Sequence, residues 1–66
     1  MYDITCNRKD DSITFFNMTY HNTIEIIEDF SSSHILEIIN NKTNNKYVII
    51  TKNDIKYFME VENKGV

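Results

Sequence analysis

The sequence has one cysteine, one glycine, no proline and no alanine, and each shortage excludes a class of protein. Because Cys6 is the only cysteine, the chain cannot form an internal disulfide, and no cysteine and histidine cluster offers the closely spaced ligands of a zinc site. The only glycine is Gly65, so no glycine-rich phosphate-binding loop is present. We therefore expect no metal and no cofactor.

Long apolar runs and an excess of positive charge are missing as well. The longest apolar run is residues 47–50, which is too short for a membrane span or a signal-peptide core. The net charge of -3 disfavours a broad electrostatic footprint for nucleic acid or an anionic membrane. With 66 residues we expect one domain, residues 1–66, with a marginal core that favours self-association, and with residues 63–66 frayed.

Isoleucine, asparagine, lysine, tyrosine and phenylalanine are abundant, which is typical of an AT-rich genome such as a low-GC bacterium, its phages or its plasmids, or a large DNA virus. Codon bias does not explain eleven isoleucines beside the single Leu36, because leucine also has AT-rich codons. This choice favours strand formers over helix formers. Sequons at Asn17 and Asn41 match what chance gives in such a chain, so we expect a cytoplasmic protein, in the host cytoplasm if a phage encodes it.

Apolar segments of about six to ten residues recur between short polar clusters, which predicts strands. The clearest turn is the polar run 41–45 between two isoleucine-rich segments, and residues 55–62 alternate as a strand does. The fold class we predict is all-β, a small antiparallel meander of five or six strands forming a barrel or sandwich. Its segments are 2–6, 12–20, 23–30, 34–40, 46–51 and 55–62.

The middle third also fits a helical pattern. Asn22 followed by Glu25 matches a capping box, and Ile24, Ile27 and Phe30 fall three apart, on one side of a helix. Against a helix stand the β-branched content and the short length. The alternative fold is α+β: two strands, one or two short helices within 23–40, then two or three strands.

The residues that could carry catalysis are few and unconnected. A thiol nucleophile needs a nearby imidazole, but nothing in the sequence brings Cys6 to His21 or His34. The carboxylates near 10–11 and 25–29 are of the kind that glycoside hydrolysis and metal binding use. A chain this short rarely builds the pocket that such chemistry needs. We therefore expect no enzyme.

Several predicted strands are apolar on both faces, although a monomeric antiparallel sheet usually buries only one. In segment 34–40, Leu36 and Ile38 oppose Ile35 and Ile39. A helix, a second copy or a partner should cover the second face. We therefore predict a small protein-interaction module, a homodimer or a phage or mobile-element inhibitor that occludes a host protein. The predicted contact residues are Phe15, Tyr47, Ile49, Tyr57 and Phe58.

The alternative function is nucleic-acid binding by a small β module. Exposed aromatics beside basic side chains bind single strands, and residues 42–58 hold aromatics near several lysines. The contacts in that case are Lys46, Lys52 and Lys56. No RNA-recognition or cold-shock stacking motif is present, so this remains the second hypothesis.

Overall fold

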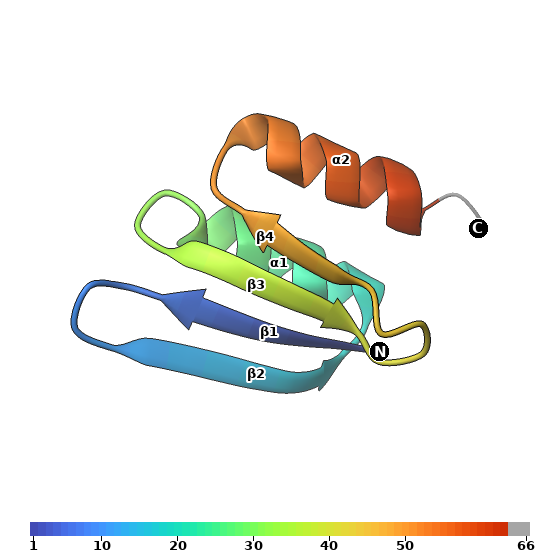
Figure 1. Cartoon of the computed structure of the whole chain (residues 1–66), viewed down its shortest axis with the longest axis horizontal. Helices are drawn as coiled ribbons and strands as arrows, with labels where there is room; N and C mark the ends of the chain where they lie inside the picture. Colours follow the sequence, from blue (N-terminus) through green and yellow to red (C-terminus); the bar gives the residue numbers. More distant parts are fainter. Residues whose placement is uncertain (64–66) are drawn as a thin grey trace.

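The computed structural model describes residues 1–63 and has an α+β fold with four strands and two helices (Figure 1). The predicted fraying of 63–66 lies mostly outside the described residues, since Asn63 is the C-cap of the last helix. The elements in chain order are β1 (Tyr2–Asn7), β2 (Ser12–Met18), α1 (Tyr20–Phe30), β3 (Ile35–Asn40), β4 (Lys46–Ile49) and α2 (Lys52–Glu62).

The four strands form one antiparallel sheet in the order β2-β1-β3-β4, so β2 and β4 are its edges. In the centre, Ile4 on β1 lies opposite Ile38 on β3 and Phe15 on β2. The β1–β2 ladder is irregular near Asp3, where Asn17 has a φ of 56° and donates its backbone N–H to the Asp3 carboxylate at 2.9 Å. The regular part of β2 therefore ends before Asn17.

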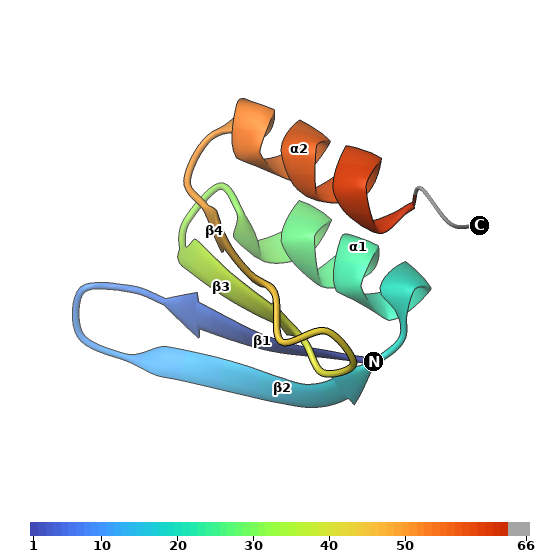
Figure 2. The same ribbon diagram turned by 45° about the vertical axis from the view of Figure 1, so that its right-hand side comes forward.

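Both helices lie on one face of the sheet, side by side in Figure 2. The core fills the space between them and that face. Ile27 from α1 and Phe58 from α2 meet alternate strand residues there. The buried strand residues are Tyr2, Ile4, Cys6, Leu36, Ile38, Tyr47 and Ile49.

The first helix fits the α+β alternative, but it begins earlier than the range 23–40 allows. Its N-cap is Thr19, whose side chain accepts a hydrogen bond from the Asn22 N–H at 3.1 Å. A threonine oxygen satisfies one of the free amide groups of the first turn, and this moves the start ahead of Asn22. After Ser31 the chain returns as strand β3, so only one of the one or two helices expected within 23–40 forms.

The second helix corrects the prediction of a strand at 55–62. Thr51 and Asp54 form a reciprocal capping box: the Thr51 side chain accepts the Asp54 N–H, and the Asp54 carboxylate accepts the Thr51 N–H at 2.9 Å. From this start, Ile55, Phe58 and Glu62 recur at helical spacing and face the sheet. The meander of five or six strands is thus reduced to four strands, and the all-β class gives way to α+β.

The polar run 41–45 is a turn between two antiparallel strands, as the sequence predicts. Asn44 takes a φ of 63°, the left-handed conformation that asparagine tolerates better than most residues. The Asn40 side-chain oxygen accepts the backbone N–H groups of Lys42 and Thr43 at 2.9 and 3.3 Å. These bonds hold the turn and set the register that places Ile38 opposite Tyr47.

Candidate interaction surface

The face of the sheet that the helices leave uncovered carries exposed apolar side chains. Ile35 and Ile39 on β3 and Val48 on β4 are 48%, 37% and 47% exposed, and Ile50, just after β4, is 63% exposed. Residue alternation places these four on the face opposite Leu36, Ile38, Tyr47 and Ile49. We call Ile35, Ile39, Val48 and Ile50 the β3–β4 patch.

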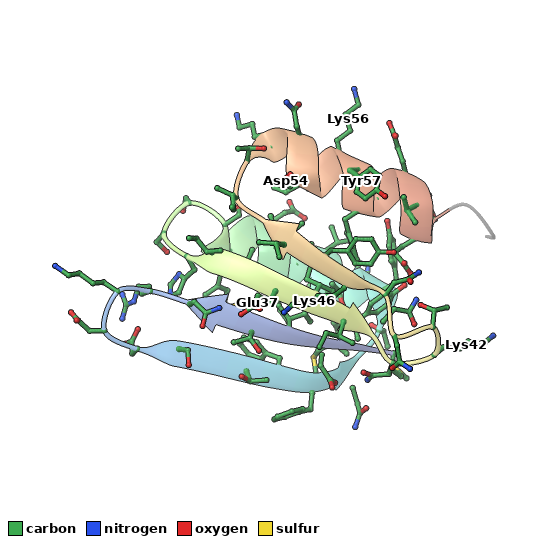
Figure 3. All side chains as sticks on the ribbon, in the orientation of Figure 1. Glu37, Lys42, Lys46, Asp54, Lys56 and Tyr57 are labelled. Atoms are coloured by element: carbon green, nitrogen blue, oxygen red, sulfur yellow. The ribbon has the colours of Figure 1, made fainter. Side chains whose placement is uncertain are left out.

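A paired polar group divides the β3–β4 patch. The Lys46 ammonium lies 2.9 Å from the Glu37 carboxylate, and Figure 3 shows the two side chains together in front of the sheet. Asn7 also donates to Glu37 at 2.9 Å. The hydrogen bonds from Lys46 and Asn7 lower the pKa of Glu37 below its ordinary value. The charges on this face are therefore satisfied within the chain.

Three of the five predicted contact residues lie in the core instead of on the surface. Phe58 is fully buried, and Tyr47 and Ile49 are almost so, because α2 covers the strand face from which the two β4 residues project. Phe15 is half-buried, with its ring 5.7 Å from that of Phe30. Only Tyr57 is well exposed, at 60%, and it lies on α2 (Figure 3).

The lysines of the nucleic-acid hypothesis do not converge. Lys46 is on the open sheet face and pairs with Glu37, whereas Lys52 and Lys56 are on α2. Figure 3 shows Lys42, Lys46 and Lys56 at separate places on the turn, the sheet and the helix. The structure therefore brings together neither the predicted lysines nor an exposed set of the predicted aromatics.

A carboxylate that sequence reasoning missed ties the end of α2 to the sheet. Glu62 accepts hydrogen bonds from the hydroxyls of Tyr2, at 2.8 Å, and Tyr47, and from the Asn40 amide at 2.7 Å. Burial alone raises the pKa of Glu62, but these hydrogen bonds outweigh it and lower the value. Burial and the bond to Glu62 raise the pKa of Tyr47 to about 12. We call these four residues the Glu62 latch.

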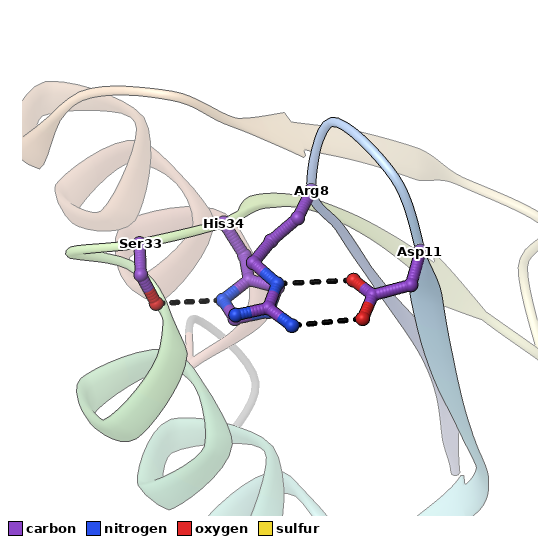
Figure 4. Close-up of polar contacts among 4 residues, drawn as sticks. All are labelled: Arg8, Asp11, Ser33 and His34. Carbon is purple, nitrogen blue, oxygen red and sulfur yellow. Dashed lines mark hydrogen bonds and ion pairs between the residues drawn. The ribbon is translucent and has the colours of Figure 1, made fainter.

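A shallow hollow of about 440 Å³ lies where the β1–β2 turn meets the end of α1, lined by 7–9 and 31–35. Arg8 donates to Asp11 through both Nε and a terminal nitrogen, at 3.0 and 2.8 Å (Figure 4). Ser33 and His34 share a hydrogen bond of 2.7 Å. The arginine is occupied, and the carbonyl end of α1 does not favour an anion, so the hollow offers no evident ligand site.

The other chemically reactive side chains are also separated. Cys6 is buried in the core, and burial raises the pKa of its thiol, which disfavours the thiolate. His21 lies 2.9 Å from Glu25 on the exposed side of α1. Among residues 1–63 no group of three histidine, cysteine or acidic residues could hold a metal ion. No helix in that range is long and apolar enough to cross a membrane.

In comparisons with protein-family models, curated proteins and solved structures, this chain has no significant match. The β3–β4 patch is therefore the main indication of function.

Proposed function

We propose that this protein is a non-catalytic interaction module that binds a partner protein through the open face of its sheet. The observation that carries the proposal is the β3–β4 patch, whose four apolar side chains are all more than a third exposed. Fully burying a side chain of this size contributes about 1.5–3 kcal/mol, so a partner that covers several of them gains affinity.

The polar pair inside the patch adds a requirement for the partner. Glu37 and Lys46 already satisfy each other, so a partner that covers them must keep their hydrogen bonds or supply new ones. A largely apolar partner surface with a few polar groups opposite this pair fits best. Binding of this kind acts by occluding the partner's surface.

Size and composition support a phage or mobile-element inhibitor of a host protein. The 66 residues are acidic and of AT-rich coding type, and an inhibitor of this size acts by contact. We accordingly propose a partner in the cytoplasm of a low-GC bacterium. The nucleic-acid alternative gains no support from the separated lysines.

The test is affinity capture from a low-GC bacterial lysate with three forms of the chain. Val48→Lys places a charge in the patch, and Tyr57→Lys places the same charge on α2, where the side chain is also exposed. We expect the wild type and Tyr57→Lys to retain the same protein and Val48→Lys to lose it. Circular dichroism confirms that all three forms are folded.

Two outcomes overturn the proposal. If Val48→Lys retains the partner as well as the wild type does, the patch is not the contact. If Tyr57→Lys alone loses the partner, the contact lies on α2, and the open sheet face is not the docking surface.

A further inference from the structure

The two edges of the sheet differ in their protection against pairing with another strand. β4 has four residues, begins with Lys46 and leads into α2. β2 has seven residues, with the sequence SITFFNM, and contains no charge and no proline. Short length, edge lysines and covering helices are the usual protection of an edge, so β4 is protected and β2 is not. Among residues 1–63 no strand pairs with the outer side of β2.

Exposed apolar side chains lie on both faces of β2. Phe16 is 64% exposed. It lies on the open face, because it is two residues from Thr14, whose side chain is hydrogen-bonded to that of Thr5 on β1. Ile13 is 45% exposed on the helix-covered face, since it pairs with the buried Cys6. A partner lying on one face would cover only one of these residues. A strand added at the edge of the sheet would place side chains beside both Phe16 and Ile13.

We propose that a second copy of this chain pairs with β2 in antiparallel fashion, across a two-fold axis at Thr14. The axis lies at Thr14 because that residue is the centre of 12–16, the part of β2 before the left-handed Asn17. In this register Ile13 lies opposite Phe15 of the partner subunit. Aromatic and β-branched cross-strand pairs of this kind stabilise antiparallel sheets. The inference is independent of the proposed function of the β3–β4 patch.

Charge and symmetry favour a second copy over a foreign strand. The chain carries a net charge of -3, so two copies repel each other over most of their surface, but β2 itself is uncharged and brings no like charges together. A two-fold contact uses the same edge twice. It therefore covers both unprotected β2 edges at once and leaves a protected β4 strand at each end of the joined sheet.

The first test is the molar mass in solution, measured by light scattering over a concentration series because a contact this small is weak. We expect the wild type to approach twice its 7.9 kDa as concentration rises. Thr14→Lys should remain at 7.9 kDa, since its two charges face each other directly on the axis, where like charges destabilise the pairing. The matched control Val48→Lys adds the same charge to the β3–β4 patch and should dimerise normally.

The second test fixes the register by mild oxidation. Thr14→Cys places two thiols on the axis, where facing residues have Cα atoms about 4.5–5.5 Å apart, which is within disulfide range. Thr5→Cys lies one strand further in, with its copies about 14 Å apart, and should stay reduced. We expect a covalent dimer for Thr14→Cys alone.

The results that overturn this inference differ from those that overturn the proposed function. A wild type that stays at 7.9 kDa at every concentration rules out the dimer, even if it still captures a partner through Val48. A dimer that Val48→Lys breaks and Thr14→Lys does not break lies on the open face instead. A dimer in which Thr14→Cys fails to cross-link has another register, and the proposed pairing is then wrong.

Discussion

Strand β3 shows the difference between the two faces of the sheet most directly. Ile38 and Ile39 are identical neighbours in the sequence, yet Ile38 is fully buried and Ile39 is 37% exposed. Leu36 and Ile35 repeat the contrast three positions earlier. Apolar character along β3 therefore does not decide which side is buried. The two helices decide it, by packing Ile27 and Phe58 against one face.

The open face is stabilised in a different way. Its polar residues pair with one another across the strands, as Lys46 does with Glu37 and Thr5 does with Thr14, at 3.2 Å. Cross-strand pairs of this kind contribute about 0.2–1 kcal/mol each, much less than a buried aliphatic side chain. The covered face thus provides most of the stability, and the open face is free to tolerate changes that serve binding.

The largest expected effect comes from comparing Ile38→Ala with Ile39→Ala. Removing the buried side chain leaves a cavity and should lower the free energy of unfolding by about 2–5 kcal/mol. Removing its exposed neighbour should change that free energy by less than about 0.5 kcal/mol. Urea unfolding of both variants beside the wild type gives the two values.

Equal losses from the two substitutions would contradict the comparison. They would mean that the face holding Ile39 is as well covered in solution as the face holding Ile38. The slope of the unfolding free energy against urea concentration serves as a control. It changes if a variant alters the compactness of the folded state.

Local signals were enough to predict the four strands of the sheet and its last turn. The apolar segments 2–6, 12–20, 34–40 and 46–51 correspond to β1, β2, β3 and β4, and the polar run 41–45 is the turn between the last two. In each case a few neighbouring residues are enough for the prediction, because turn-forming residues stand next to strand-forming ones. Element boundaries moved by a few residues where Thr19 capped α1 ahead of the predicted start.

The segment 55–62 was mispredicted because two periods fit it. Alternation of Ile55, Tyr57 and Met59 reads as a strand, while Ile55, Phe58 and Glu62 recur at helical spacing. The deciding signal was the pair Thr51 and Asp54, which forms the capping box. It lies just outside the segment and is visible in the sequence.

The surface was predictable in part. Apolar residues on both sides of β3 and β4 indicate that something must cover a second face of the sheet. Which face is covered depends on where α1 and α2 pack, and local sequence patterns do not predict this. For that reason Tyr47, Ile49 and Phe58, which the sequence predicts as contact residues, lie in the core. Glu62 had no signal either, since its partner Tyr2 is 60 residues away.

The next largest effect should come from Glu62→Gln, which weakens the latch that keeps α2 on the covered face. The carboxylate accepts three hydrogen bonds, and bonds to a charged group contribute about 1.5–3 kcal/mol. We expect a loss of about that size in the free energy of unfolding. Glu60→Gln, an exposed glutamate on the same helix, should cost less than about 0.5 kcal/mol. Equal costs would show that the latch does not hold α2.

A smaller effect should follow from Thr51→Ala, which removes the N-cap of α2. The Thr51 hydroxyl accepts the Asp54 N–H, and loss of an N-cap typically costs about 1 kcal/mol. Lys52→Ala, at the first position of the same helix, is the matched control and should be nearly neutral. Thermal unfolding of both variants separates the cap from a general effect of substitution; a neutral Thr51→Ala would argue that Phe58 alone fixes the helix.

The smallest effect should be the acid dependence of the Glu62 latch. The pKa of Glu62 in the folded chain lies below its ordinary value of 4.5, so the folded state binds this proton more weakly than the unfolded state does. Its contribution to stability is therefore complete above pH 4.5 and is lost as the pH falls through the folded pKa. The difference in unfolding free energy between the wild type and Glu62→Gln should shrink on acidification. Asp54 and Glu37, whose pKa values are also lowered, are common to both proteins and cancel in the comparison. A difference for Glu62→Gln that stays unchanged down to about pH 3 would mean that the side chain holds α2 by packing rather than by charge, and the covered face would then depend on Phe58 and Ile55 alone.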